Sequence, residues 1–537
     1  MNGDESYIHA SREHIDRDDI MQKATKPLDD VAPPTRIDEA IGTLSPGEAR
    51  FEWWRQSVGL FCGPIAFLIV WFLPLHALSE PAHRLAAIVA LVVVWWVTEA
   101  IPIPATALIG AALTVVFGVT TAREAFAPFA DPIIFLFIGS FMIGRAIADH
   151  GLDRRLAYSL LSIKAAQGSL ARIAVAVSGL ALLMSAWMSN TATTAMMLPV
   201  AMGVLHATGR ARGPSAKKSS YSFLLAIAYA ASVGGIMTPV GTPPNLMTIG
   251  MLDRLGGVTI TFFGWMVLAV PIGLGVAGAL FLITGYRLAG GGELRPAATS
   301  FLDEQRPAGP WTTGQRNAAI AFGVAVILWV TPGLIALVGS PDSPTYVLLG
   351  ARLQESVVAI GAASLLFLLP TDWRKRQFTL SWESASRIDW GTILLFGGGL
   401  SLGHLMFTTG LAKHIGASLV QASGAESLWA VTAMAIVLGM VMTEVASNTA
   451  ATNMVVPVVI SICQASGLSP VPPAVGACLA ASMAFMLPIS TPPNAIMYGS
   501  GLVPITAMIR NGILLDVVAA IVIFIGLRVL CPLLGFA

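Results

Sequence analysis

Two short polar stretches lie inside long apolar segments of this chain, and they hold the same three residues in the same order. The first triplet, Ser189–Thr191, stands in "MSNTATTAMMLPV", and the second, Ser447–Thr449, stands in "SNTAATNMVVPV". Hydrocarbon supplies no hydrogen bonds, so a break in a membrane helix needs partners for its free N–H and C=O groups. Because Ser, Asn and Thr are good helix N-caps, each triplet predicts a break after which a second helical arm begins.

A second motif is also written twice, as "GTPPN" at 241–245 and "STPPN" at 490–494. Proline suits the first turn of a helix, where an N–H has no helical partner, so both motifs predict helix starts with Thr242 and Thr491 as caps. Four half-helix N-termini would then face one region near the membrane midplane. Each presents free N–H groups and the positive end of a helix dipole, which favours an anion.

The opposite ends of the broken helices present carbonyl oxygens. Ser185 and Thr443 each stand four residues before their triplet, a spacing that puts their hydroxyls on the same helix face, one turn behind it. Together with the Ser and Asn oxygens of the triplet and the carbonyl of Gly241 or Ser490, they predict two oxygen shells that suit Na⁺. The pattern therefore indicates an anion site with sodium bound beside it.

The whole chain provides a membrane setting for these motifs. It has 537 residues, of which 55% are hydrophobic and 11% are charged, and apolar runs of about 20 residues recur along most of its length. We expect an all-α polytopic membrane protein with about 11 transmembrane helices and two re-entrant hairpins, near 170–207 and 426–466. The net charge of +1 gives no reason to expect nucleic acid, and the four cysteines have no metal or redox spacing. No nucleophile–base pair or metal cluster suggests an enzyme.

The chain also contains a repeat. Asp131 and Asp389 open similar segments, and they are 258 positions apart, as are Ser189 and Ser447. Five crossings in each unit would invert the second unit in the membrane, as in many transporters. We expect these divisions: 1–55, a polar and partly disordered cytoplasmic tail; 56–83, the first transmembrane helix; 84–288, the first repeat; 289–315, a cytoplasmic linker; and 316–537, the second repeat.

The placement of Lys and Arg predicts the orientation. With the N-terminus in the cytoplasm, most basic residues fall in inner loops. The first hairpin then opens from the cytoplasm, the second opens from outside, and the C-terminus lies outside. Glu444 is the sole Asp, Glu, Lys or Arg between Leu428 and Ile509, and it is interpreted either as a coupling-ion or proton site or as a structural residue.

The paired SNT and TPPN motifs, with "WWVTEAIPIPATAL", resemble the divalent anion/sodium symporter (DASS) family, the relatives of the sodium–dicarboxylate cotransporters. The resemblance covers residues 57 to 537. It implies a homodimer in the cell's inner (plasma) membrane, with a scaffold domain and an elevator-type transport domain. It implies these substrate-binding residues: Asn190, Thr191, Thr242, Asn448, Thr449, Thr491 and Pro492. It also implies one sodium site formed by Ser185, Ser189, Asn190 and Gly241. The other would be formed by Thr443, Ala446, Ser447, Asn448 and Ser490, where Ser490 departs from a frequent alanine.

We therefore expect a secondary active transporter that imports di- or tricarboxylates, with succinate-like C4 acids favoured, coupled to transported sodium ions. The alternative is a sodium-independent dicarboxylate exchanger, because the family contains such exchangers and the SNT motifs do not exclude them. A sulfate transporter or an anion channel with re-entrant pore loops are further alternatives. The expected partners are a small divalent anion, Na⁺, membrane lipid and a second copy of the chain.

Overall fold

The computed structural model describes residues 46–161, 169–207, 214–288, 309–338, 344–424 and 427–536. The section Leu44–Ala537 forms one compact unit, and its fold is described here by itself. Most of the expected polar tail 1–55 and most of the expected linker 289–315 lie outside the described residues, so these two expectations remain predictions.

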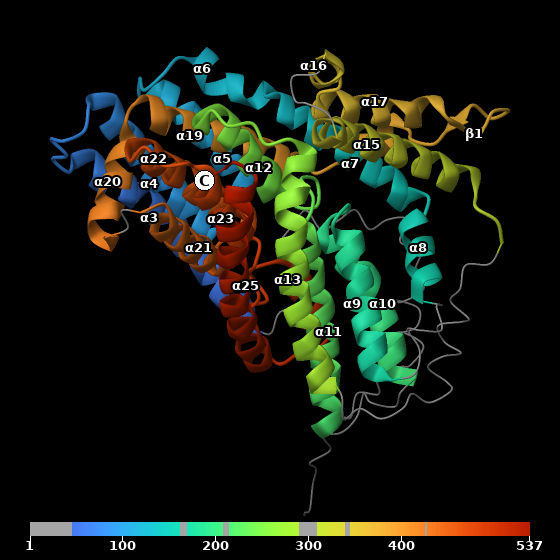
Figure 1. Ribbon diagram of the computed structural model, residues 1–537. Coiled ribbons are helices and arrows are strands. Elements are labelled where there is room, and N and C mark those ends of the chain that lie inside the picture. The colour runs from blue at the N-terminus through green and yellow to red at the C-terminus, as the bar shows by residue number, and fades with distance from the viewer. Residues whose placement is uncertain are drawn as a thin grey trace, which may run out of the picture. The chain divides into compact units, whose positions relative to one another are not determined.

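The first half of this unit is helical throughout its described part (Figure 1). Its elements are α3 (Pro46–Phe72), α4 (Glu80–Thr98), α5 (Ile103–Val116), α6 (Ala122–Phe126), the 3-10 helix η2 (Ala127–Ala130), α7 (Pro132–Asp149), α8 (Leu152–Leu161), α9 (Leu170–Ser185), α10 (Asn190–Ala207), α11 (Pro214–Gly235), α12 (Pro243–Met251), the π-helix η4 (Leu252–Gly256) and α13 (Phe262–Leu288).

The second half repeats this order, with one small addition. Its elements are α15 (Thr313–Val338), α16 (Pro344–Arg352), α17 (Glu355–Leu368), β1 (Pro370–Asp372), β2 (Gln377–Phe378), α18 (Trp382–Ala385), α19 (Trp390–Thr408), α20 (Leu411–Ser423), α21 (Leu428–Val445), α22 (Asn448–Ala465), α23 (Val471–Ala481), α24 (Pro492–Gly499) and α25 (Ile505–Leu533). The strands β1 and β2 pair antiparallel, with Pro370 opposite Phe378 and Asp372 opposite Gln377.

The internal repeat is visible in how equivalent helices begin. Asp131 and Asp389 are the N-caps of α7 and α19, and their carboxylates accept hydrogen bonds from backbone N–H groups of the first turn. From there the order long helix, short helix, two arms, broken helix and long helix is the same in both halves. The shared start at an aspartate is a local capping effect, which explains why it could be read from the sequence.

Eight helices of the described chain are long and apolar enough to cross a membrane, and four shorter apolar helices accompany them. This number differs from the eleven expected crossings for a simple reason. The expected spans at 221–252 and 473–504 are each divided into two helices by a break, and α5 and α17 have only 14 residues each. The result is a nearly all-helical, multi-pass membrane protein.

The first long helix begins earlier than expected. α3 starts at Pro46, whereas the tail was expected to continue to residue 55. Proline suits the first turn of a helix, and the ion pair between Arg55 and Glu52, 2.8 Å apart, lies on adjacent turns of the added segment. The helix therefore extends beyond its apolar part through polar residues that the apolar count did not include.

Helix packing separates two groups of elements. In one group α4 packs on α3 and α5, α5 packs on α19, and α17 packs on α7 and α15. In the other, the arms α9 and α21 pack on α11 and α23, and α13 lies beside α25 (Figure 1). Two contacts exchange partners between the repeats, because α10 packs on α24 and α12 packs on α22. The second arm of each hairpin thus meets the broken helix of the other repeat.

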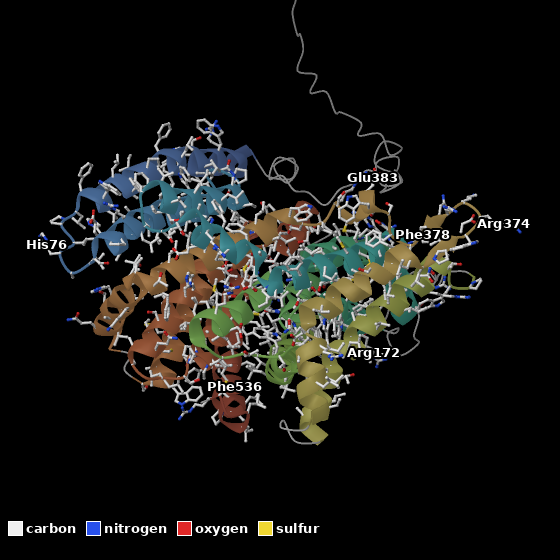
Figure 2. All side chains as sticks on the ribbon, turned by 90° about the horizontal axis from the view of Figure 1, so that it is seen from above. His76, Arg172, Arg374, Phe378, Glu383 and Phe536 are labelled. Carbon is white, nitrogen blue, oxygen red and sulfur yellow. The ribbon has the colours of Figure 1, made fainter. Side chains whose placement is uncertain are left out.

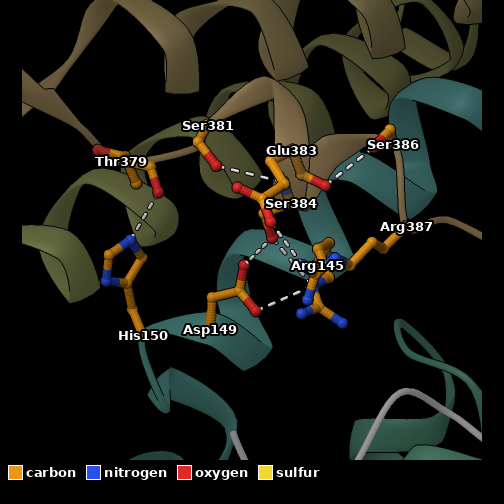
Figure 3. Close-up of polar contacts among 9 residues, drawn as sticks. All are labelled: Arg145, Asp149, His150, Thr379, Ser381, Glu383, Ser384, Ser386 and Arg387. Carbon is orange, nitrogen blue, oxygen red and sulfur yellow. Dashed lines mark hydrogen bonds and ion pairs between the residues drawn. The ribbon is translucent and has the colours of Figure 1, made fainter. Parts of the chain in front are cut away.

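Polar side chains join the end of α7 to the segment that carries β2 and α18 (Figure 3). Arg145 Nε lies 2.9 Å from Asp149 and donates to Ser384 Oγ at 3.1 Å, while Ser384 also contacts Asp149. His150 Nε2 lies 2.7 Å from the Thr379 carbonyl oxygen. These contacts tie the first repeat to the β1–β2 hairpin, in which Figure 2 labels the exposed Phe378 and Arg374.

Candidate functional site

The two triplets stand at the tips of helical hairpins, as predicted. α9 ends at Ser185 and α10 begins at Asn190, while α21 ends at Val445 and α22 begins at Asn448. Figure 1 shows α9 and α10 side by side, in agreement with their packing. In the second hairpin Ser447 is the N-cap of α22, and its hydroxyl accepts from the Ala450 N–H at 3.3 Å. The triplet is therefore both a turn and a helix start.

A hydroxyl behind each tip contacts the asparagine of the triplet. Ser185 Oγ donates to Asn190 Oδ1 at 2.6 Å, and Thr443 Oγ1 lies 2.8 Å from Asn448 Oδ1. The predicted placement of these hydroxyls on the face of the triplet is thereby confirmed. In each pair the hydroxyl holds the amide oxygen. Among the described residues, neither amide nitrogen makes a hydrogen bond, so both remain available as donors.

The helix breaks at the TPPN motifs are closed by their asparagines. Asn245 Nδ2 donates to the carbonyl oxygens of Gly235 at 2.9 Å and Thr238 at 2.7 Å. Asn494 Nδ2 donates to the carbonyl oxygens of Ala484 and Leu487, both at 3.0 Å. All of these groups are buried or half-buried, so the amides satisfy carbonyls that the broken helices leave free.

Thr242 and Thr491 occupy the N-cap positions of α12 and α24, with extended backbone, as predicted. Neither side chain makes the expected capping hydrogen bond. The Thr491 hydroxyl is buried and has no hydrogen-bond partner among the described residues. Position and backbone follow from the prolines that come next, but the hydroxyls stay free for another role.

Carbonyl oxygens gather around Gly241 in the first repeat. A Cβ atom at Gly241 would lie 2.5 Å from the Gly235 oxygen, 2.9 Å from the Ala186 oxygen and 3.0 Å from the Ser185 oxygen. Thr238 Oγ1 also contacts the Ala186 oxygen. Such uncovered carbonyls at a helix break are ligands that bind Na⁺ in transporters. The structure thus brings Ser185, Asn190 and Gly241 together, while the Ser189 side chain is exposed and makes no hydrogen bond in the described chain.

The second repeat has an equivalent cluster with an added carboxylate. Thr443 Oγ1 lies 2.5 Å from the Ala481 carbonyl oxygen, and Ala446, between the two arms, is buried and extended. Ser490 Oγ lies 3.1 Å from the Glu444 carbonyl oxygen and 2.8 Å from Glu444 Oε2. Ser490 therefore contributes its hydroxyl to this cluster, which alanine would not.

The residues expected to touch an anion differ in exposure. Asn190, Thr191, Asn448 and Thr449 are half-buried, Thr242 and Thr491 are buried, and Pro492 is exposed. No hydrogen bond joins the first tip to the second within the described chain. They are related instead by the exchanged packing of α10 on α24 and α12 on α22.

Three groups near this site were missed by sequence reasoning. Asn245 and Asn494 belong to motifs already singled out, and their role as break-closing amides could have been inferred from the need to satisfy carbonyls. Asp516 is the one acidic residue of α25, and its position inside a long apolar helix was a signal that went unused. Its carboxyl lies beside that of Glu444.

Comparison with known proteins bears on these features. The family described as "Sodium:sulfate symporter transmembrane region" matches residues 52–535. The chain is 31% identical over 496 residues to the "Sodium-dependent dicarboxylate transporter SdcS" of Staphylococcus saprophyticus, covering 89% of this chain and 92% of that protein. It is 30% identical over 494 residues to the protein of the same name from Staphylococcus aureus strain USA300, with the same two coverages.

A solved structure is similar in fold. The YdaH transporter of Alcanivorax borkumensis, whose crystal structure is described as having an unusual topology, superposes with a TM-score of 0.54. The superposition covers 85% of this chain and 99% of that one, at 15% sequence identity. This likeness concerns the arrangement of the helices.

Proposed function

Because the chain belongs to the sodium:sulfate symporter family, we propose that it is a secondary active transporter that imports a small di- or tricarboxylate together with sodium. The family and the relatives named above are transporters and not enzymes. A C4 dicarboxylate such as succinate is the substrate that we favour. The observation that carries this proposal is the duplicated tip, in which a hydroxyl holds the amide oxygen of Asn190 or Asn448.

The duplicated tip offers neutral donors to an anion. With its oxygen held by Ser185 or Thr443, each asparagine amide presents its N–H groups away from that hydroxyl. The first-turn N–H groups of α10 and α22 add further donors and the positive ends of two dipoles. No Asp, Glu, Lys or Arg lies between Ile173 and Gly209, so carboxylates of the substrate would be held by dipoles and not by ion pairs. Two such tips suit a substrate with two carboxylates.

Sodium would bind behind the tips, where the carbonyl clusters are. In the first repeat the oxygens of Ser185 and Asn190 and the carbonyls around Gly241 supply hard ligands. In the second repeat the Thr443 hydroxyl, the Asn448 amide oxygen and the Ser490 region do the same. A cation there would stabilise the break and the tip together, so substrate and sodium would favour each other's binding.

We propose an elevator movement for the transport cycle, in a homodimer. The hairpins and broken helices would move together against a scaffold that contains α4, α5, α15 and α17. The packing supports this division, because α4 packs on α5 and α15 on α17, while α9, α11, α21 and α23 form separate pairs. α19 packs on both α5 and α22 and would lie at the boundary. A crosslink from α22 to α19 should stop transport and leave succinate binding to the locked protein intact.

The direct test is uptake of labelled succinate into proteoliposomes that contain the purified chain. We expect accumulation driven by an inward sodium gradient and none when choline replaces sodium. Equal exchange of succinate in sodium, potassium and choline, without net sodium-driven uptake, would make the chain an exchanger instead. Labelled sulfate belongs in the same assay, because the family description favours it as a second candidate. Sodium-driven sulfate uptake that succinate does not inhibit would replace the dicarboxylate proposal.

A further inference from the structure

The second repeat contains a buried carboxyl that neither sodium cluster uses. Asp516 lies on α25 and is 4% exposed, and both of its carboxylate oxygens lack a hydrogen-bond partner among the described residues. A buried carboxylate without donors or a counter-charge is very unfavourable, because burial removes its hydration. The side chain therefore needs a positive ligand.

The packing of α25 explains how Asp516 reaches this position. Gly512 stands one turn before Asp516 on the same helix face. A Cβ atom at Gly512 would lie only 2.4 Å from the Phe485 carbonyl oxygen and 2.6 Å from Met486 Cα. The absence of a side chain lets α25 rest directly on the break between α23 and α24. Asp516 is thereby brought to the residues that hold Glu444.

Glu444 already has a full set of donors, and it has none to share. Its Oε1 accepts from the N–H groups of Phe485 at 2.9 Å and Met486 at 3.1 Å, and its Oε2 accepts from Ser490 Oγ at 2.8 Å. These bonds suit an ionised Glu444. The Asp516 carboxyl lies within hydrogen-bonding reach of it. Two carboxylates side by side in an apolar region repel each other unless a cation lies between them.

The other polar groups around the pair do not provide that charge. The Tyr229 hydroxyl donates to the Phe485 carbonyl oxygen at 2.9 Å, on the other side of the break, and its ring packs on Phe485. The Arg287 guanidinium contacts Asn511. Among the described residues, no Lys, Arg or His forms an ion pair with Glu444 or Asp516.

The pair is present in one repeat only. The residue equivalent to Glu444 in the first hairpin is Ala186, 258 positions earlier, and α13 has no acidic residue to match Asp516. The two oxygen clusters behind the tips, in contrast, are present in both repeats. The carboxyl pair is therefore additional to them.

We propose that the Asp516 and Glu444 carboxyls together hold one small monovalent cation, either sodium or a proton, beyond the ions of the two duplicated clusters. The cation compensates the second carboxylate and ties α25 to the tip of the second hairpin. As a transported ion it rests on the proposed symport function. As a binding site it stands on the geometry of the pair alone.

The transport test compares the wild type with Asp516→Asn, which keeps the side-chain shape and removes the charge. Glu80→Gln, a change of an exposed acid on α4, is the matched control. In proteoliposomes at a potential set by potassium and valinomycin, the voltage at which net succinate flux stops gives the charges moved per succinate. We expect one fewer positive charge in Asp516→Asn and no change in Glu80→Gln. An unchanged number in Asp516→Asn overturns the proposal.

Separate sodium and pH gradients identify the cation. Loss of one sodium equivalent from the coupling of Asp516→Asn identifies sodium, and loss of one proton equivalent identifies a proton. A binding measurement covers the case in which the chain does not transport succinate. The thermal unfolding of the purified full chain is followed against sodium concentration and against pH, since each bound cation steepens the dependence.

In that measurement we expect Asp516→Asn to lose one cation's worth of dependence on sodium or on pH relative to the wild type and to Glu80→Gln. Wild-type succinate uptake that fails while this difference persists removes the symport function and leaves the site. Equal dependence in all three proteins removes the site. If Asp516→Asn is not recovered from the membrane in folded form, the smaller neutral variant Asp516→Ser takes its place with the same expected loss.

Discussion

Asn245 and Asn494 hold equivalent positions in two helix breaks, and each donates to the carbonyl oxygens of the residues ten and seven positions before it. The two amides therefore fix the shape of the breaks from which the carbonyl clusters are built. Replacing one of them leaves two carbonyl oxygens without a donor in a buried region. This relationship gives the first prediction.

Asn494→Ala and Asn245→Ala should each destabilise the protein. Leaving a buried polar group unsatisfied costs about 1–3 kcal/mol, and each variant affects two such groups. We expect a clear drop in the thermal unfolding midpoint of the detergent-purified protein. Ser232→Ala is the control, because the Ser232 hydroxyl is buried in α11 with no partner in the described chain. If the Asn variants unfold at the same temperature as Ser232→Ala, the amides do not hold the breaks.

The asparagines of the triplets should determine substrate affinity. Asn190→Ala and Asn448→Ala each remove a donor to a charged group, which costs about 1.5–3 kcal/mol or very roughly 10- to 150-fold in affinity. Succinate titrations of uptake at saturating sodium measure the effect. Thr193→Val tests a neighbouring buried hydroxyl that has no described partner, and it should leave affinity near the wild-type value. Near-normal affinity in both Asn variants would remove these residues from the site.

The hydroxyls behind the tips should influence sodium more than succinate. Ser185→Ala and Thr443→Ala each remove an oxygen that contacts the triplet asparagine. We expect a higher sodium concentration for half-maximal uptake, with succinate affinity largely restored when sodium is saturating. A defect in succinate affinity that no sodium concentration corrects would show that the hydroxyls only orient the amides.

Gly241→Ala should disrupt the first carbonyl cluster alone. The added methyl group would lie within 3.0 Å of three backbone oxygens, which cannot move aside as a flexible side chain could. We expect loss of sodium-dependent uptake with the protein still present in the membrane. Gly144→Ala on α7 has open space around its Cβ position and serves as the control. Retained sodium coupling in Gly241→Ala would place the ion elsewhere.

The orientation of the repeats can be tested with single cysteines. Lys218, near the start of α11, and Ser466, just after α22, are both exposed. In a background lacking Cys62, the one exposed cysteine of the four, Lys218→Cys should react with an impermeant reagent from the cytoplasmic side and Ser466→Cys from outside. Reaction of both positions from one side would contradict the inverted arrangement.

Local features of the site were predictable from the sequence. The starts of α10 and α22 at Asn190 and Asn448, and of α12 and α24 at their prolines, follow from capping and from the fixed φ of proline. The Ser185–Asn190 contact follows from helical spacing, because the two residues lie about one turn apart. In each case the interacting groups are near one another in the chain.

Contacts between distant segments were not predictable in this way. The meeting of Asp516 and Glu444 depends on α25 resting on the break after α23, which a single missing side chain at Gly512 permits. The unbonded hydroxyls of Thr242 and Thr491 also differ from expectation, since cap preference concerns frequency and does not fix a hydroxyl rotamer. Periodicity and composition contain no information on which surfaces approach so closely.

The exchanged packing of α10 on α24 and α12 on α22 also bears on the origin of the molecule. A protein made of one repeat would leave the second arm of its hairpin and its short broken helix without their packing partners. Two copies, however, could supply each other with both surfaces at once. A half-length ancestor would therefore have functioned as a mutual pair, and joining two genes into one would have made that pairing permanent. Each copy could then diverge separately, and Glu444, which faces Ala186 in the alignment of the halves, is a trace of such divergence.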